Sequence, residues 1–432
     1  MVLQHRRFQQ PVGQGFFHTG MLEENGSVFH YVFDCGSMST YKVARRARIK
    51  AYRKIVLPGR VLDALFVSHA HADHLNGLEQ LLAPGLQVDT IVIPLLNAVD
   101  RLLAFGRDLV EDAASAQNAF YRDFIVDPVS ALGRFKPRQI LVVQPRRDGP
   151  GAPGSEGDGF DGPDGGGLVG SERSQTRLGW KVVGRGSVRP HNGKEYAASG
   201  PLVALLDDTV AVGVPLSASR FWLLAPYVDP MVEGERKRFM KTLAAELRAS
   251  GAHALARKIN ALGAADLSEI IQNHVAALSA AYASIAKNLN VTSLCLYSGP
   301  APQGTKPLAR YGWRSGRWES TYPDVGDRIA WLTTGDAALK EGHRRKAFLQ
   351  HFGNLLAKVV TLTLPHHGSD HNCDRQLITA INAEIFVVAA DRYGTWRHPG
   401  SNVIQEVASA GRFLSVVTSN ESSFTSEWAS MA

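Results

Sequence analysis

Residues 62–82 read LDALFVSHAHADHLNGLEQLL, an apolar run followed by four closely spaced metal-type ligands and then by an apolar pattern of helical period. The first seven residues are typical of a buried strand and the last eight of a helix. Just past a strand end, His69 and His71 lie on the same side of the chain, so that both imidazoles can bind one cation. Asp73 and His74, at the start of the helix, turn toward a second cation. The stretch therefore predicts a site for two divalent metal ions.

Further candidate ligands follow later strands, at the position where sites lie in layered α/β folds. The strand-like runs IAWLTT, VVTLTL and AEIFVVAA are followed by Asp336, by His366 and His367, and by His398. Two-metal hydrolysis needs a carboxylate to bridge the ions and further ligands to complete each shell. We therefore expect these side chains to converge on the first motif. The candidates for direct catalysis are Asp73, Asp336 and His367, with Asp73 or Asp336 orienting a metal-bound hydroxide and accepting its proton.

The order of strand-like and helix-like runs predicts an α/β fold. Residues 8–36 form two apolar runs around Glu-Glu-Asn-Gly, which is typical of a hairpin, and a helical stretch follows around 98–132. Further strands are expected at 62–68, 90–95, 139–143, 179–184, 202–206, 221–225, 293–298, 329–334, 359–364, 383–390 and 413–418.

Two segments interrupt this pattern. Residues 148–170 are rich in glycine and cannot pack a core, so we expect a flexible surface insertion there. Residues 231–287 are rich in alanine, leucine and charge with a helical period, which predicts an insertion of two or three helices. Because ligands on both sides of these segments must converge, we expect one catalytic domain over 1–432.

The composition is that of a globular chain. Of 432 residues, 44% are hydrophobic and 20% charged, which excludes global disorder. No apolar run is long enough to span a membrane, and the basic N-terminus lacks the apolar region of a secretory signal. The three cysteines are widely spaced, which favours a reducing compartment, and we expect a cytoplasmic protein.

The net charge of +7 is concentrated in one stretch, since eight basic residues and no acidic one lie between Asp34 and Asp63. One interpretation is the solvated face of a helix. The other is a patch that faces phosphate groups beside a cleft. The possible phosphate contacts are Arg45, Arg46, Arg48 and Lys50.

The motifs resemble those of a known family. HxHxDH after a buried strand is the signature of the metallo-β-lactamase superfamily, whose fold is an αββα sandwich of two mixed sheets flanked by helices. More specifically, an ordered set of motifs is similar to the hydrolase domain of the ComEC-type DNA-uptake proteins. The set is VGQG (12–15), VFDCG (32–36), SHAHADHLNGLE (68–79), FWLLAP (221–226), TSLCL (292–296), LTTGDAAL (332–339), LPHHGSD (364–370) and RYG…HP (392–399).

The resemblance implies a role for each matching residue. His69 and His71 match ligands of the first metal ion, Asp73 and His74 ligands of the second, and Asp336 the bridging carboxylate. His398 matches the histidine that closes the second site. Asp34 matches a carboxylate that orients a ligand histidine.

The sequence departs from the family at the third ligand of the first site, where no histidine is evident. His191, Tyr227 and Asp229 are alternatives, and His366 or His367 is another. The membrane channel that accompanies the domain in the uptake proteins is missing, so their DNA-uptake role does not transfer.

The implied activity is metal-dependent hydrolysis of phosphodiesters, with DNA as the leading substrate and two divalent ions, Zn²⁺ or Mn²⁺, as cofactors. A second hypothesis keeps the hydrolase but gives it a small ester, lactone or cyclic phosphodiester as substrate. A third makes the chain a subunit of a multi-protein system that binds a protein partner through 231–287.

Overall fold

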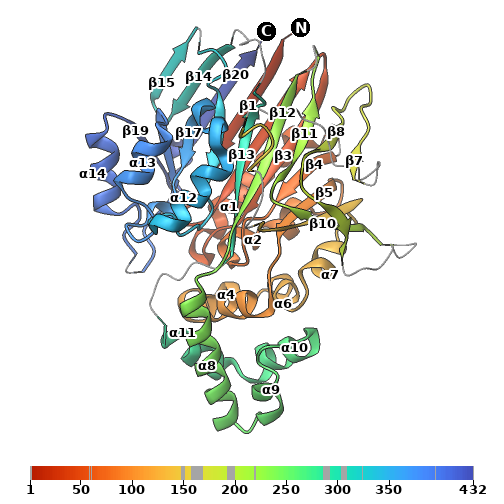
Figure 1. Ribbon diagram of the computed structural model, residues 1–432, viewed down its shortest axis with the longest axis vertical. Coiled ribbons are helices and arrows are strands. Elements are labelled where there is room, and N and C mark those ends of the chain that lie inside the picture. The colour runs from red at the N-terminus through yellow and green to blue at the C-terminus, as the bar shows by residue number, and fades with distance from the viewer. Residues whose placement is uncertain are drawn as a thin grey trace.

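A computed structural model describes residues 2–431 apart from 58, 60, 147–150, 157–168, 192–199, 218–219, 286–291, 303–308, 324 and 395. Most of the Gly-rich segment 148–170 lies outside the described residues. The described residues form two facing β-sheets with helices on their outer sides (Figure 1).

The larger sheet begins with the N-terminus and, in the described part of the chain, has the strand order β15-β14-β20-β1-β2-β3-β4-β5-β6-β10-β9. From β3 to β10 along this order the strands are parallel, and the other neighbours are antiparallel. Its strands are β1 (Leu3–Gln9), β2 (Phe17–Glu24), β3 (Ser27–Cys35), β4 (Val61–Phe66), β5 (Gln87–Pro94), β6 (Gln139–Gln144), β9 (Val188–Pro190), β10 (Leu202–Asp207), β14 (Ala309–Ser315), β15 (Trp318–Tyr322) and β20 (Thr425–Met431).

The smaller sheet has the order β19-β18-β17-β16-β13-β12-β11-β8-β7 among described residues, and its first four strands are parallel. Its strands are β7 (Gly170–Ser171), β8 (Trp180–Gly184), β11 (Val210–Pro215), β12 (Phe221–Asp229), β13 (Ser293–Pro300), β16 (Ala330–Thr333), β17 (Val359–Thr363), β18 (Ile385–Ala389) and β19 (Phe413–Val417). Both sheets are mixed, as expected from the sequence.

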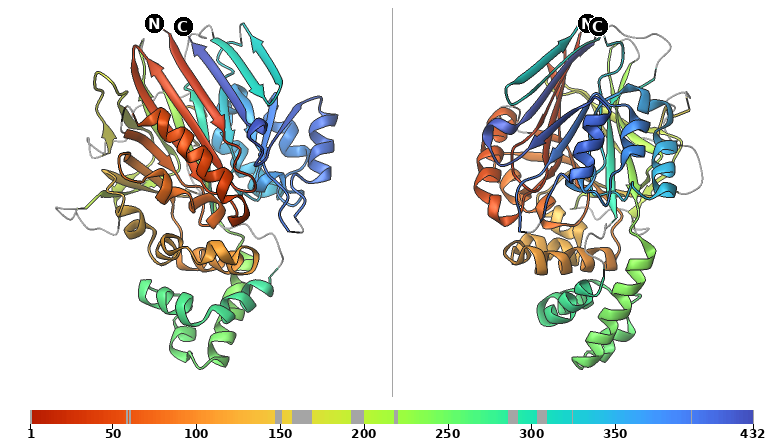
Figure 2. Two further views of the ribbon diagram at one scale, coloured as in Figure 1. Left: turned by 180° about the vertical axis from the view of Figure 1, so that it is seen from behind. Right: turned by 90° about the vertical axis from the view of Figure 1, so that its left-hand side faces the viewer.

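Three apolar cores hold the layers together. One lies between the sheets and includes Tyr31, Trp222 and Trp331. The second packs helices on the outer side of the larger sheet, and the third packs helices on the outer side of the smaller one. The edge-on view in Figure 2 has the red α1 (Lys42–Val56) on one side and the blue α12 to α14 on the other. The predicted αββα sandwich is therefore confirmed.

The helices lie between the strands along the chain. They are α2 (Ala72–Leu75), α3 (Leu78–Leu81), α4 (Ala98–Glu111), α5 (Ala113–Ala116), α6 (Ala119–Val126), α7 (Pro128–Gly133), α8 (Glu233–Ala249), α9 (His253–Arg257), α10 (Ala264–Asn273), α11 (Val275–Ala283), α12 (Gly342–Phe352), α13 (Arg375–Ile381) and α14 (Ser401–Ser409). Short 3₁₀ turns occur at Ser39–Tyr41, Gly353–Lys358, His366–Gly368 and Glu421–Ser423.

The helix expected over 75–82 is two short turns instead. The break falls at Gly77, whose N–H donates to the Cys35 carbonyl at 2.8 Å. A Cβ atom at Gly77 would lie 2.6 Å from that carbonyl oxygen. The close approach to β3 therefore takes the place of a continuous helix.

Seven strands among the described residues lie outside those expected from the sequence: β1, β7, β9, β11, β14, β15 and β20. The last three close one end of the larger sheet. The C-terminal β20 pairs with the N-terminal β1 along its whole length and with β14 on its other side. Both chain ends consequently lie side by side in this sheet (Figure 1).

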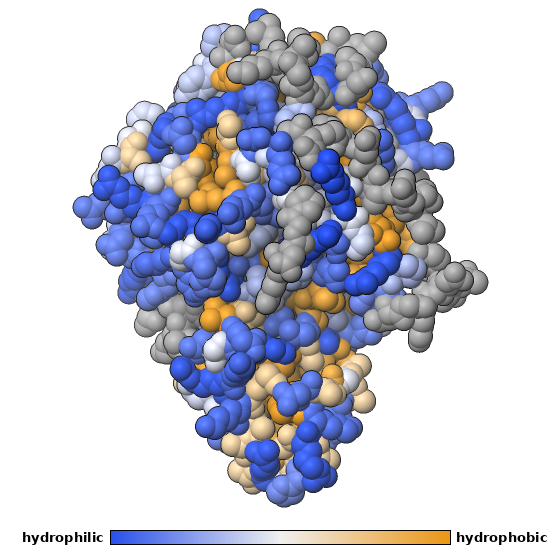
Figure 3. Space-filling view, viewed as in Figure 1, coloured by the Kyte–Doolittle hydropathy of each residue, from blue (hydrophilic) through white to orange (hydrophobic). Residues whose placement is uncertain are grey.

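Residues 231–285 of the segment 231–287 project below the sandwich as a lobe (Figures 1 and 2). Its described residues form four helices, α8 to α11, rather than two or three. On the face seen in Figure 3, apolar residues of this lobe lie between charged ones. Its buried residues, among them Phe239 and Leu278, share one core with Leu102 and Phe105 of α4, so the lobe is continuous with the sandwich. Within the described part of the chain, every helix is too short or too polar to cross a membrane.

Candidate metal centre

The HAHADH loop begins where β4 ends and passes over the end of β3. Ser68 is fixed by Asp34, which accepts from its N–H at 2.7 Å and from its hydroxyl at 2.6 Å. The Asp34 carboxylate also accepts from His74 Nδ1 at 2.7 Å. Because the Ser68 hydroxyl donates to Asp34, its oxygen accepts from His69 Nδ1 at 2.8 Å. Both histidines thereby carry a proton on Nδ1 and point Nε2 to the interior of the site.

The other half of the site comes from the ends of β16 and β17. The backbone is left-handed at Gly335, His366 and His367, with φ of 48°, 48° and 55°. Left-handed backbone costs energy at non-glycine residues and tends to occur at functional sites. His366 N–H donates to the Gly335 carbonyl at 3.0 Å, which ties the two strand ends together.

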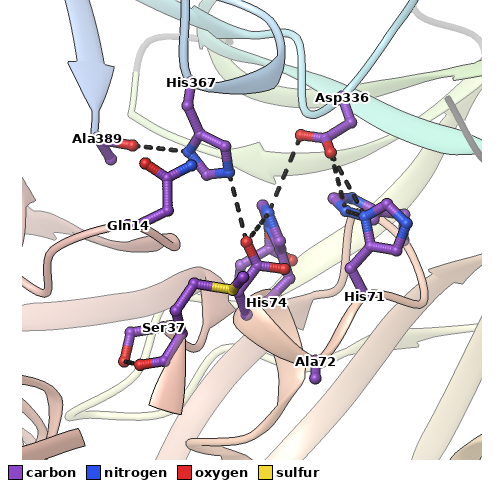
Figure 4. Close-up of polar contacts among 12 residues, drawn as sticks. Gln14, Ser37, His71, Ala72, His74, Asp336, His367 and Ala389 are labelled. Atoms are coloured by element: carbon purple, nitrogen blue, oxygen red, sulfur yellow. Dashed lines mark hydrogen bonds and ion pairs between the residues drawn. The ribbon is translucent and has the colours of Figure 1, made fainter. Parts of the chain in front are cut away.

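Asp336 is the point at which the two halves meet. Its Oδ2 lies 3.3 Å from His69 Nε2, 3.5 Å from His71 Nδ1 and 3.3 Å from His366 Nδ1. We call these four residues the first group. Figure 4 shows Asp336 facing His71 and His74 from the opposite side of the site. All four side chains are buried.

A second group lies beside the first and consists of Asp73, His74, His367 and the other oxygen of Asp336. His367 Nε2 lies 3.5 Å from Asp73 Oδ2, and His74 Nε2 lies 4.0 Å from Asp73 Oδ2 and from Asp336 Oδ1. His367 Nδ1 donates to the Ala389 carbonyl of β18 at 2.6 Å, so its Nε2 is the atom with a free lone pair (Figure 4). The HH dipeptide therefore contributes one histidine to each group.

His398 lies at the rim. It is partly exposed, and its ring centre is 5.8 Å from that of His366 and 6.4 Å from that of His367. Burial and these two histidines lower the pKa of His398 to about 3. Its imidazole is consequently neutral, and its buried Nδ1 has no hydrogen-bond partner in the described part of the chain.

The donor atoms fit a divalent cation. Asp73 Oδ2, His74 Nε2 and His367 Nε2 are buried and make no hydrogen bond among the described residues, yet they face one another. Two sets of ligand atoms lie close enough together to hold an ion: His69, His74 and Asp336, and Asp73, His74 and His367. Unpaired polar atoms at such depth are costly unless a ligand binds them.

The charges of the site agree with this fit. Although burial raises the pKa of Asp336, its histidine neighbours outweigh burial and hold the pKa well below the usual value. Burial lowers the pKa of His366 to about 4. Burial also lowers the pKa of His74, but Asp34 and Asp73 outweigh it and raise that pKa to about 9. His74 is therefore protonated at neutral pH in the metal-free protein, and it must release the proton on Nε2 to bind an ion. Ionised carboxylates and imidazoles are ligands that Zn²⁺ and Mn²⁺ accept. All three thiols, Cys35, Cys295 and Cys373, are buried and free.

Other residues considered for the third ligand of the first site lie elsewhere. His191 lines a surface pocket with Arg101 and Asp127. Tyr227 packs on Phe348 and His351. Asp229 accepts from the Ala338 N–H at 2.8 Å and from Arg344 at 2.6 Å, so it braces the loop after Asp336. His366 is the residue that reaches the first group.

The basic stretch forms α1, and its residues divide into two sets. Arg45 is buried and donates to the Ser37 carbonyl at 3.0 Å, Arg48 pairs with Glu421, and Arg53 donates to carbonyls at the end of α3. Arg45 is thus not an exposed phosphate contact, because its guanidinium is engaged inside the fold. The exposed basic side chains of α1 are Lys42, Arg46, Lys50 and Lys54.

One residue of the site was missed in the sequence. Arg107 of α4 is buried and donates to Asp73 Oδ1 at 2.9 Å. Its signal was weak, because it stands between the apolar positions of a helix where a charged residue is normally solvated. The nearby acidic residues Asp108 and Glu111 were a hint that the helix has a buried charged face.

The comparison with protein families agrees with this geometry. Residues 19–92 match the Metallo-beta-lactamase superfamily. The matched segment runs from β2 to β5 and includes the HAHADH loop. This superfamily consists mostly of hydrolytic enzymes and usually binds divalent metals, so the match points to a metal-dependent hydrolase. A search of curated proteins found no match, and the resemblance to the ComEC-type hydrolase domain stays a prediction.

Proposed function

We propose that this chain is a metal-dependent phosphodiesterase that acts on DNA. The observation that carries the proposal is the convergence of carboxylates and imidazole lone pairs on Asp336. We assign a first ion to His69, His71, His366 and Asp336, and a second ion to Asp73, His74, His367 and Asp336. Divalent ions at such a site lower the pKa of bound water and neutralise the charge that develops on phosphate oxygens.

The protein groups around this pair have separate tasks. Asp336 belongs to both groups through its two oxygens, so it sets the spacing between them. Asp73 is held at Oδ1 by Arg107, which leaves Oδ2 to bind an ion or to accept a proton from the attacking water. At the rim, the imidazole of His398 is neutral. We propose that its unpaired Nδ1 acts as a ligand atom at the open side of the site.

The exposed basic side chains of α1 support DNA as the substrate. Lys42, Arg46, Lys50 and Lys54 are four residues apart and form one ridge along the helix. None of them forms an ion pair with a carboxylate in the described part of the chain. The ridge begins beside Tyr41, whose hydroxyl donates to the Arg392 carbonyl in the loop that carries His398. A chain of phosphates at the rim of the site can therefore continue along this ridge.

The activity is tested with purified protein and added Zn²⁺ or Mn²⁺ on linear DNA, circular DNA, RNA, a chromogenic phosphodiester, a lactone and a thioester. We expect cleavage of DNA and of the chromogenic phosphodiester. His71→Ala should abolish it, while His343→Ala, a change at an exposed histidine of α12, should leave it intact. Equal DNA cleavage by both variants would reveal a contaminant. Hydrolysis of the lactone or thioester alone would replace the phosphodiesterase by a small-molecule hydrolase.

DNA binding through the ridge is tested with Lys42→Gln/Arg46→Gln/Lys50→Gln. The dependence of log affinity on log salt should become shallower by about two to three units, since each lost phosphate contact removes about 0.9. The matched control neutralises Lys237, Arg238 and Lys241, three exposed basic residues of α8. An equal decrease of the salt dependence in both triple variants would show that the ridge contributes only through the net charge of the protein and not through specific phosphate contacts.

A further inference from the structure

The two oxygens of Asp73 lie in different surroundings. Oδ1 accepts from Arg107 Nη1 at 2.9 Å, whereas Oδ2 makes no hydrogen bond among the described residues and faces His74 and His367. The hydrogen bond to Oδ1 restricts rotation of the carboxylate. Arg107 thus decides which oxygen of Asp73 faces the second group.

Arg107 is itself held from several directions. Its Nε donates to Glu111 Oε2 at 3.0 Å, one helical turn further along α4. The guanidinium carbon lies 5.1 Å from the ring centre of Trp396, in the loop that carries His398. The Tyr393 hydroxyl of the same loop donates to the Glu111 carbonyl at 2.6 Å.

Glu111 connects this arrangement to the helical lobe. Its second oxygen, Oε1, accepts from the Tyr282 hydroxyl at 2.7 Å. Tyr282 belongs to α11, the last helix of the 231–287 segment, and it is mostly buried. Gly106, beside Arg107, allows this approach, because a Cβ there would lie 3.3 Å from Cβ of Tyr282. A continuous chain of hydrogen bonds therefore runs from the lobe to Asp73.

Asp108, the residue after Arg107, binds the backbone of the HAHADH loop through its side chain. Asp108 accepts from the Ala72 N–H at 2.7 Å and from the Tyr121 hydroxyl at 2.6 Å. One turn of α4 thus fixes both the backbone before Asp73 and its carboxylate. If the ion pair between Arg107 and Asp73 served only stability, we would expect both oxygens of Asp73 to be hydrogen-bonded, yet Oδ2 has no hydrogen-bond partner among the described residues.

We propose that Arg107 is a positioning residue for Asp73 in the second group, and that the helical lobe completes this support through Tyr282 and Glu111. The inference rests on the proposed assignment of Asp73 to a metal ion. Residues that hydrogen-bond a metal ligand fix its orientation, and their loss typically lowers metal affinity about 10- to 100-fold.

The test compares metal binding by the full-length chain and its variants. Affinities for two ions are measured by competition with a chromophoric chelator for Zn²⁺ and by the absorption spectrum of the Co²⁺-loaded protein. Arg107→Met should weaken the second ion about 10- to 100-fold and change the Co²⁺ spectrum, while the first ion stays within about threefold of wild type. Arg107→Lys should restore part of the affinity, because lysine keeps the charge but cannot bond Asp73 and Glu111 in the same fixed geometry.

Two further variants separate positioning from general stability. Tyr282→Phe should weaken the same ion by less than about tenfold, since it removes one hydrogen bond. Arg101→Met is the matched control, because Arg101 lies on the same helix but donates to carbonyls at the end of α6. Its metal affinities should equal those of wild type even where its thermal stability falls.

Each contrary outcome has a defined meaning. Wild-type affinity for both ions in Arg107→Met would overturn the positioning role, and so would an equal loss of both ions. An unchanged second ion in Tyr282→Phe would remove the lobe from the proposal. If Arg107→Met does not fold, Arg107→Lys decides the positioning role, and wild-type affinity for the second ion in that variant would overturn it. Binding of fewer than two ions by wild type would overturn the two-ion centre and this inference together, and the hydrolysis assay would report on the function independently.

Discussion

Two buried clusters of charged side chains join the two sheets, and they differ in how completely their polar atoms are paired. In one, Arg7 of β1 donates to both oxygens of Glu427 of β20, at 2.8 and 2.6 Å. Arg7 also donates to the Ile329 carbonyl at 2.9 Å, and the hydroxyls of Tyr311 and Thr361 donate to Glu427. We call this the Arg7–Glu427 cluster. Within the described part of the chain, no polar side-chain atom of Arg7 or Glu427 lacks a partner.

The candidate metal centre is just as buried, but several of its ligand atoms make no hydrogen bond in the described part of the chain. Asp73 Oδ2, His74 Nε2 and His367 Nε2 face one another and make no hydrogen bond among the described residues, and the backbone is left-handed at His366 and His367. The comparison teaches that burial of charge does not by itself indicate function. What distinguishes the candidate metal centre is the set of facing ligand atoms that make no hydrogen bond in the described part of the chain.

The largest effect is expected from Asp336→Ala, because Asp336 belongs to both groups. We expect hydrolysis to fall by at least about a hundredfold and both ions to be lost. The thermal stability of the metal-free protein should fall by less than in Glu427→Gln, because Asp336 contacts the imidazoles of His69, His71 and His366 rather than a permanently charged guanidinium. Enzyme assay, elemental analysis and thermal unfolding of the chelated protein check the three parts. Retention of both ions would contradict the placement of Asp336 between them.

The opposite pattern is expected from Glu427→Gln, which leaves the Arg7 cation buried without its carboxylate. Breaking one partner of a buried ion pair costs about 3–5 kcal/mol in the free energy of unfolding. Denaturant unfolding should show this loss while the metal content stays at the wild-type level. In the double variant Arg7→Met/Glu427→Leu much of the stability should return, because no charge remains unpaired. A loss of metal in Glu427→Gln would mean that the two clusters are coupled.

The same contrast explains what could be predicted from the sequence. His69 to His74 stand within six residues after an apolar strand, so a local pattern reveals them, and the family match covers this half. Asp336 and His366 were predicted only as strand-end candidates, because the pairing of β16 with β17 that brings them together is not visible in a linear pattern. Arg107 and Tyr282 are 175 positions apart in the sequence, and the residues next to each of them give no sign that it lies near the site.

The fold shows the same limit. The buried parallel strands were predicted because they are continuous apolar runs. Strands β14, β15 and β20 were missed, since their residues are mixed and gain their apolar contacts by pairing. Gly312 of β14, for example, leaves the space that Trp428 of β20 occupies, and a Cβ there would lie 2.1 Å from the Trp428 ring.

A smaller effect is expected from removal of metal by a chelator. An ion that binds only the folded state stabilises it by about 2.7 kcal/mol when its concentration is a hundred times its dissociation constant. Chelation should therefore lower the thermal midpoint of wild type and of Glu427→Gln by similar amounts and leave that of Asp336→Ala unchanged. Calorimetry with and without chelator measures both differences. A shift in Asp336→Ala equal to that of wild type would place the stabilising ion outside the candidate centre.

The smallest effect concerns a histidine near the Arg7–Glu427 cluster. His18 stacks on Trp331 with ring centres 3.8 Å apart, and burial together with the nearby Arg7 holds its pKa well below the usual 6.5. Since the folded state keeps this imidazole neutral, stability is complete above about pH 6.5 and falls as the pH drops below it, where the unfolded chain binds the proton. The loss is about 1.4 kcal/mol per pH unit for one such group.

His18→Phe keeps a planar ring against Trp331 and removes this titration. In chelated protein, the free energy of unfolding of wild type should therefore fall by about 1 kcal/mol more than that of the variant between pH 6.5 and 5.5. His5, whose pKa is lowered by burial and by Arg7, is present in both proteins and cancels in the difference. Parallel pH profiles would show that His18 binds a proton in the folded state. The Arg7–Glu427 cluster would then accommodate a protonated His18 beside Arg7. In that case only the arrangement of the side chains, and not the tolerance of charge, would distinguish this cluster from the candidate metal centre.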